Sequence, residues 1–67
     1  MHGEVPHRLL HQRVRDIASG AVGELMAVVV EDVGRTGGPY WVELAYIRPD
    51  RGGREFTTAV GNIEACR

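Results

Sequence analysis

The chain lacks several of the features by which short proteins stabilise a small core. Its single cysteine, Cys66, cannot form an intrachain disulfide, and paired Cys and His residues at the spacing of a structural zinc site are missing. A protein of 67 residues also buries only roughly 60% of the surface that its unfolded chain exposes. We therefore expect one domain over residues 1–67, stabilised by an efficient core or by a partner subunit.

Basic charge and long apolar runs are scarce as well. The net charge is −1, and all eight basic residues are Arg. Because nucleic-acid binders neutralise phosphates with basic side chains, this composition argues against nucleic acid as a partner. No apolar run approaches the ~18 residues of a membrane span, and the start of the chain, "MHGEVPHRLLHQR", lacks the apolar core of a secretory signal. We expect a cytoplasmic protein with no membrane partner.

Turn signals divide the rest of the sequence into short runs rich in β-branched and aromatic residues. The signals are "SGAVG", "GRTGGP", "PDRGG" and "AVGN". The runs predict strands at 12–17, 24–33, 40–47, 54–58 and 63–66, with one 3₁₀ turn at 59–62. Val14 and Phe56 are expected to face inward, as is Ile17 with less support. At least one of Gly52 and Gly53 is expected to need positive φ.

The N-terminal segment 1–11 allows two structures. Pro6 suits the first turn of a short helix. Val5, Leu9 and Leu10 equally suit an extended arm that folds over the rest of the domain. The residues themselves leave both possibilities open.

The two longest predicted strands, 24–33 and 40–47, are apolar on both faces. The alternation does not show which face is the core. Together the two faces carry more apolar surface than one small core can bury, and such a patch marks an interface. We expect a homodimer, because most soluble oligomers are symmetric assemblies of one chain. The alternative is that the N-terminal segment covers the patch.

This order of elements resembles a small SH3-like barrel of the kind found in KOW, Tudor and PRC-type modules. The resemblance covers about residues 12–66 and rests on "RVRDIASGAVGELMAVV" and "GGREFTTAVGNIEA". The chain also resembles short uncharacterised proteins of Streptomyces-type actinobacteria, which share an "RVRD…G.VGE" opening and a "GGREF" return. The fold class that this implies is all-β, a small five-stranded SH3-like barrel over 12–66 with a short N-terminal arm or helix at 1–11. The basic character of the KOW motif is missing here.

Arginines and aromatic residues cluster around the "PDRGG" turn, which makes this region a candidate interaction surface. Its residues are Trp41, Tyr46, Arg48, Arg51 and Arg54. Arg side chains beside aromatic rings can bind acidic groups of a protein partner or stack on nucleic-acid bases. The alternative is that these arginines only solubilise a hairpin tip. We predict a non-catalytic binding or scaffolding module, with a nucleic-acid-associated regulator as the second hypothesis.

Residue types suited to catalysis or metal binding are sparse. His7 and His11 would lie one turn apart on a helix, and Cys66 could add a third metal ligand if the chain ends meet. Carboxylates such as Asp16 are expected at strand ends, in solvent. A chain this small has little room for a substrate pocket. We predict no enzyme activity, catalytic residue, cofactor or metal, and a small enzyme or metal-binding protein is the third hypothesis.

Overall fold

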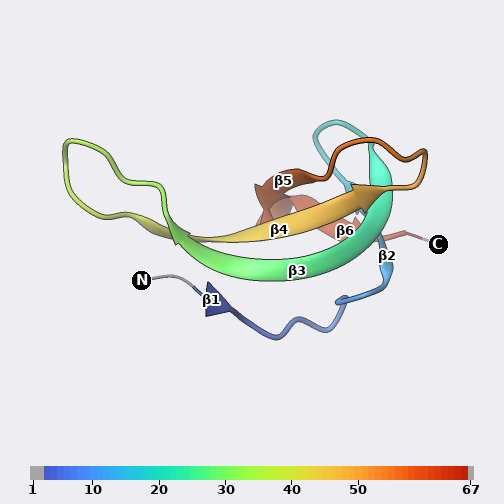
Figure 1. Cartoon of the computed structure of the whole chain (residues 1–67), viewed down its shortest axis with the longest axis horizontal. Coiled ribbons are helices and arrows are strands. Elements are labelled where there is room, and N and C mark those ends of the chain that lie inside the picture. The colour runs from blue at the N-terminus through green and yellow to red at the C-terminus, as the bar shows by residue number, and fades with distance from the viewer. Residues whose placement is uncertain (1–2, 67) are drawn as a thin grey trace.

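A computed structural model of the chain describes residues 3–66 and contains strands but no α-helix in that range (Figure 1). The strands are β1 (Gly3–Glu4), β2 (Arg13–Asp16), β3 (Val22–Asp32), β4 (Trp41–Pro49), β5 (Phe56–Ala59) and β6 (Ile63–Ala65), and the 3₁₀ turn η1 (Val60–Asn62) lies between β5 and β6. The all-β prediction is confirmed. In the part of the chain that is described, no helix is long and apolar enough to cross a membrane.

All the strands belong to one antiparallel sheet, which is open. The hydrogen-bonded path runs β5-β4-β3-β2-β6, and β1 pairs with the second half of β3. The predicted five-stranded barrel is not confirmed, because the sheet has six strands and is not closed. The sixth strand arises where Gly3 and Glu4 pair with Val30 and Val29. β5 and β6 stand at opposite ends of the path and are joined by η1 rather than by pairing.

β3 and β4 form a long ribbon that contains a bulge. Leu25 faces Ile47, but the next pair is Ala27 with Tyr46, so Met26 is an extra residue on β3. A bulge shifts the alternation of faces by one position. Leu25 and Val28, three residues apart, are therefore both buried. The face that carries them is called the inner face, and the opposite face of β3 and β4 is called the outer face.

The core lies against the inner face of the strongly curved sheet. Its buried side chains are Leu9, Val14, Leu25, Val28, Ala45 and Ile47, and Phe56, Val60 and Ile63 are among the partly buried residues packed on them. Val14 and Phe56 face inward as predicted. The expectation for Ile17 was wrong: its side chain is 48% exposed, because the chain has already left β2 for the turn before β3.

Gly23 on β3 allows the backbone at the end of β4 to approach β3 closely. A Cβ atom at Gly23 would lie 2.1 Å from the carbonyl oxygen of Arg48 and 2.9 Å from a methyl group of Ile47. Real Cβ atoms do not tolerate such contacts, so only glycine permits this backbone approach. The close approach helps to wrap the sheet around its small core.

The N-terminal segment lies as an extended arm that ends in a turn. Its backbone follows the edge of β3: the Val5 N–H donates to the Val28 carbonyl at 2.8 Å, and the His11 N–H donates to the Leu25 carbonyl at 2.7 Å. The turn brings Leu9 into the core. Of the two structures that the sequence allowed, the chain adopts the extended one, and Leu9 of this arm packs against the inner face.

The glycines of the "PDRGG" turn have the conformation that the sequence predicted. Gly52 has φ of 79° and Gly53 has φ of 95°, a region that favours glycine. The Gly52 N–H donates to the Pro49 carbonyl at 3.1 Å. The turn that links β4 to β5 is therefore correctly assigned.

Candidate interaction surface

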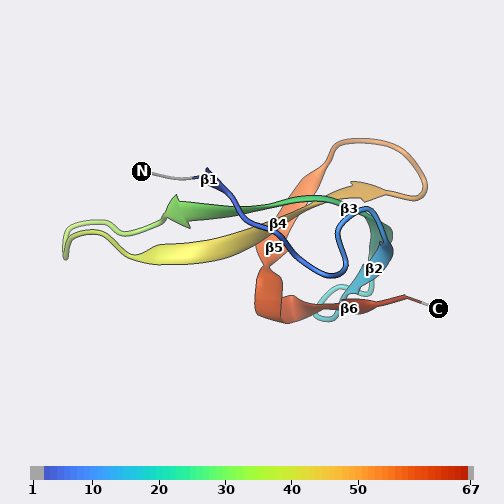
Figure 2. The ribbon, with the colours of Figure 1, turned by 90° about the horizontal axis from the view of Figure 1, so that it is seen from below.

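The outer face of β3 and β4 carries a contiguous set of apolar side chains. The strand register places them on three successive rungs, a rung being a pair of facing residues on the two strands: Ala27 with Tyr46, Val29 with Leu44, and Glu31 with Val42. Each of these side chains is half-buried, whereas the inner-face residues Val28, Ala45 and Ile47 are buried. In Figure 2, β6 lies on one side of the β3–β4 ribbon, and the β4–β5 turn rises on the other side near one end of the ribbon.

Glu31, the one acidic residue on these rungs, is bound by a tyrosine on the same face. The Tyr46 hydroxyl donates a hydrogen bond to Glu31 Oε2. This bond to the carboxylate, assisted by burial, raises the pKa of Tyr46 above its usual value. Since their rungs are separated by that of Val29 and Leu44, the contact extends the Tyr46 side chain along the apolar set.

A row of charged residues borders the apolar rungs. Arg13 on β2 faces Glu24 on β3, and Glu24 faces Arg48 on β4, so the three share the outer face. Arg13 also forms an exposed ion pair with Asp50, with Nη2 2.6 Å and Nε 2.7 Å from Oδ2. Glu24 lies 3.6 Å from His11 Nδ1. The row therefore alternates in sign across the sheet.

The remaining arginines of the predicted surface lie in the β4–β5 turn. Arg51 and Arg54 are exposed there, and among residues 3–66 neither they nor Arg48 form an ion pair. Arg51 lies at an open groove of about 430 Å³, which the turns at 19–22 and 49–51 form together with Arg13. The Arg13–Asp50 ion pair joins β2 to the second of these turns.

Trp41 lies apart from the other predicted residues. It faces Asp32 on the rung beyond Glu31 and Val42, so by alternation it belongs to the inner side of the ribbon, whereas Tyr46 and Arg48 belong to the outer face. Five residues along β4 separate it from Tyr46, about 17 Å at a strand rise of about 3.3 Å. Trp41 is 46% exposed at the projecting end of the ribbon, next to Tyr40 at 66% and Val33 at 45%. The structure thus splits the predicted surface in two.

The projecting end of the ribbon is organised by Asp32. Its Oδ1 accepts hydrogen bonds from the Gly34 N–H at 2.8 Å and from the Tyr40 N–H at 2.9 Å. These backbone bonds, the one from Tyr40 first, lower the pKa of Asp32 below its usual value. The two aromatic residues at this end are therefore held on an ordered hairpin.

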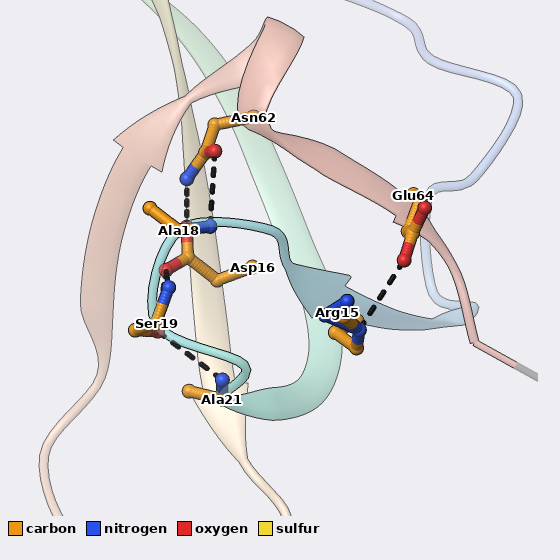
Figure 3. A network of polar contacts seen from close by, with 7 residues as sticks. All are labelled: Arg15, Asp16, Ala18, Ser19, Ala21, Asn62 and Glu64. Atoms are coloured by element: carbon orange, nitrogen blue, oxygen red, sulfur yellow. Dashed lines mark hydrogen bonds and ion pairs between the residues drawn. The ribbon is translucent and has the colours of Figure 1, made fainter.

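Asp16 does not lie in solvent as expected but is buried in a polar network (Figure 3). Its side chain is 6% exposed and accepts hydrogen bonds from the Ser19 hydroxyl, the Ser19 N–H at 3.0 Å and the Asn62 amide. Asn62 Nδ2 also donates to Thr58 at 2.8 Å, and Asn62 Oδ1 accepts from the Ala18 N–H at 3.2 Å. These bonds, above all that from the Ser19 hydroxyl, lower the pKa of Asp16. The network fastens η1 to the β2–β3 turn and is structural.

His7, His11 and Cys66 each make a separate contact. His7 Nδ1 accepts the Leu9 N–H at 3.1 Å, His11 lies beside Glu24, and the Cys66 N–H donates to the Arg13 carbonyl at 2.9 Å. Within residues 3–66, no three side chains of His, Cys, Asp or Glu lie close enough together to hold a metal ion.

Comparisons of the chain with models of protein families, with curated proteins and with solved structures each found no match. The functional argument therefore depends on the geometry of the outer face and of its charged border. Two residues essential to that geometry, Glu24 and Glu31, were not part of the predicted surface. Their positions opposite Arg48 and Val42 follow from the hairpin register, which alternation alone does not supply.

Proposed function

We propose that this protein is a small non-catalytic binding or scaffolding module that associates with a second copy of itself through the outer face. One observation carries the proposal: five apolar side chains occupy consecutive rungs on one face of β3 and β4 and are half-buried, whereas those on the inner face are buried. A contiguous apolar patch with a polar rim is typical of an interface between proteins. The alternating charges beside it supply such a rim.

The exposed area supports the same conclusion. The chain exposes 4775 Å², whereas a folded monomer of 7.4 kDa is expected to expose about 4,200 Å². The excess accompanies an elongated shape of 38 × 22 × 19 Å, with the β3–β4 ribbon projecting from the body. A standard interface covers about 800 Å² on each partner, roughly a sixth of the exposed surface.

The distribution of charge favours a protein partner over nucleic acid. Arg13 is paired with Asp50, and Arg15 is paired with Glu64 at 3.2 Å, so neither offers a free charge to a phosphate. Arg48, Arg51 and Arg54 form no ion pair among residues 3–66, but Arg48 lies opposite Glu24 and the net charge of the chain is −1. A nucleic-acid surface requires several uncompensated cations on one face, because each phosphate contact releases counterions.

We also propose that β2 to β6 constitute an SH3-like barrel to which β1 is added. The support is the order of the strands: the last strand pairs with the first of the five, the middle three follow in sequence, and a 3₁₀ turn precedes the last strand. In this description β1 extends the ribbon edge beyond the barrel and lengthens the surface next to Val29 and Val30.

Sedimentation equilibrium at micromolar concentrations tests the proposed association. We expect a mass near twice the 7.4 kDa of one chain. Leu44→Asp places a carboxylate in the centre of the outer face and should yield a folded monomer, with far-UV circular dichroism reporting the fold. Ile17→Asp is the matched control, because Ile17 is an exposed apolar residue in a turn outside these rungs. A wild-type chain that stays monomeric at 100 µM or so would contradict the proposal, since contacts of this size reach at least micromolar affinity.

A further inference from the structure

The outer face has two kinds of asymmetry between β3 and β4. On one rung a small side chain on β3, Ala27, stands opposite a large one on β4, Tyr46. On the outer-face rung before it, a negative side chain on β3, Glu24, stands opposite a positive one on β4, Arg48. The rung of Val29 and Leu44 pairs two aliphatic side chains. The rung of Glu24 and Arg48 is therefore complementary to itself when the two strands are exchanged, whereas the rung of Glu31 and Val42 pairs a carboxylate with an apolar side chain.

Such a surface is complementary to a copy of itself under one particular rotation. A two-fold axis that runs along the ribbon, between β3 and β4, turns the outer face over and exchanges the two strands. Every rung then lies over the same rung of the partner, with β3 of one copy facing β4 of the other. Sheets that pack face to face keep their strands nearly aligned, about 10 Å apart, which this rotation provides.

The rotation brings opposite charges together at one rung and apolar side chains together at the next two, and it places Glu31 of each copy over Val42 of the other. The Tyr46 side chain, held towards Glu31 by its hydroxyl, lies over the rung of Val29 and Leu44 and would meet the apolar side chains of the partner there. Leu44 meets Val29, an apolar contact on both sides of the axis. Arg48 meets Glu24, and because the contact occurs twice, it forms two ion pairs in one dimer. Arg48 is exposed and has no ion pair among the described residues, so it is available for this contact.

The other two-fold arrangement that stacks these faces is less favourable. An axis that lies across the strands leaves β3 over β3 and β4 over β4 and reverses the order of the rungs. If such an axis crosses the centre of the ribbon, it brings Glu24 of one copy towards Glu31 of the other. Like charges brought together in an interface are costly, whereas unlike charges fix its register.

We propose, as a refinement of the self-association described above and dependent on it, that two copies pack outer face to outer face about a two-fold axis parallel to β3 and β4, with Glu24 of each copy paired with Arg48 of the other. The interface is isologous, as closed two-fold dimers require. It limits assembly to two copies, because each outer face is used once.

Two charge-reversal variants test this arrangement. In Glu24→Arg both cross-dimer contacts become positive with positive, and in Arg48→Glu both become negative with negative. We expect the dissociation constant of each variant to rise at least about tenfold in sedimentation equilibrium. In an equal mixture of the two, both contacts join opposite charges again. Native mass spectrometry should then show the mixed dimer well above the half that random exchange gives.

The mixture separates contacts between chains from contacts within one chain. Each variant also places like charges on one rung of its own sheet, and mixing the variants does not repair this destabilisation. Glu43→Arg is the control, because Glu43 is exposed on the opposite face of β4, and it should neither weaken the dimer nor select a mixed one. Glu24→Gln, without charge reversal, keeps the test valid if Glu24→Arg fails to fold, since its mixture with Arg48→Glu should again exceed random exchange.

The outcomes distinguish this arrangement from the self-association on which it rests. A wild-type dimer whose variants keep its affinity, or whose mixture is random, overturns the strand-exchanging axis and leaves self-association intact. A wild-type chain that is monomeric throughout, including one that binds a different protein, overturns both. A wild-type dimer with weakened variants and an enriched mixed dimer supports the arrangement.

Discussion

The buried carboxylate of Asp16 should make a large, pH-dependent contribution to stability. Asp16→Asn keeps the size of the side chain but removes the charge and one acceptor, so that an amide faces the Ser19 hydroxyl and the Asn62 amide. Hydrogen bonds to a charged group contribute about 1.5–3 kcal/mol each, although they do not add when they share one acceptor group. We expect a loss of about 2–3 kcal/mol at neutral pH. The whole chain has about 3–10 kcal/mol of stability to lose, so the effect should be plain.

The sign of the pH dependence follows from the direction of the pKa shift. The pKa of Asp16 in the folded protein lies below its usual value of 3.8, so the unfolded chain binds more protons between the two values. The contribution is therefore complete above the usual value and is lost as the pH falls through the folded pKa. Urea unfolding followed by far-UV circular dichroism at pH 7 and at successively lower pH measures it. The difference between wild type and Asp16→Asn should shrink on acidification.

Two results would refute this reasoning. A difference below about 0.5 kcal/mol at pH 7 would mean that water replaces the network at no cost. A difference that does not change with pH would mean that the charge of the Asp16 carboxylate is not what the bonds stabilise. Asp50→Asn is the comparison, because Asp50 forms an exposed, solvent-screened ion pair with Arg13, so this substitution should change the stability much less than Asp16→Asn.

Three further predictions follow from the backbone and from the charges. Gly23→Ala should destabilise the protein by about 2 kcal/mol or more in thermal unfolding, because its Cβ would meet the Arg48 carbonyl, whereas Gly61→Ala meets nothing within 4 Å and should have little effect. Gly52→Val and Gly53→Val should each cost about 1 kcal/mol or more, and unchanged melting temperatures would show that the positive φ values are unimportant. Fluorescence anisotropy should find DNA and RNA binding no tighter than roughly 10⁻⁴ to 10⁻⁶ M at physiological salt. Sub-micromolar binding that is lost when the arginines at 48 and 51 are replaced would instead favour a regulator.

Much of the fold could be predicted because the signals are local. Turn residues mark the ends of the strands, and β-branched residues fill them, so strand positions, the 3₁₀ turn at Val60–Asn62 and the conformation of Gly52 and Gly53 follow from short stretches. The conformation of the N-terminal segment could not be predicted, because its apolar residues fit either a helix or an extended arm. Contacts with β3, which are distant in sequence, favour the arm.

The core face of the ribbon and the border of the candidate surface could not be predicted from alternation. Strict alternation puts Leu25 and Val28 on opposite faces, and the bulge at Met26 places both in the core. Alternation along one strand also does not show which residues of the neighbouring strand it faces. The pairing of Glu24 with Arg48 could therefore not be predicted from the sequence. The burial of Asp16 had a local signal in the Ser residue three positions later, which can bind a turn carboxylate.

The pairing of β2 with β6 bears on how this protein reaches its structure. Val14 faces Ala65, so the two strands join opposite ends of the chain, whereas β3 and β4 are joined by a short hairpin. Closing a long loop costs more chain entropy than closing a hairpin, and distant contacts therefore form late. The β3–β4 ribbon should therefore form first, and both of its faces should be exposed to solvent until the rest of the core packs. Substitutions in β6 should accelerate unfolding and leave the refolding rate nearly unchanged, because β6 joins the structure after the rate-limiting step.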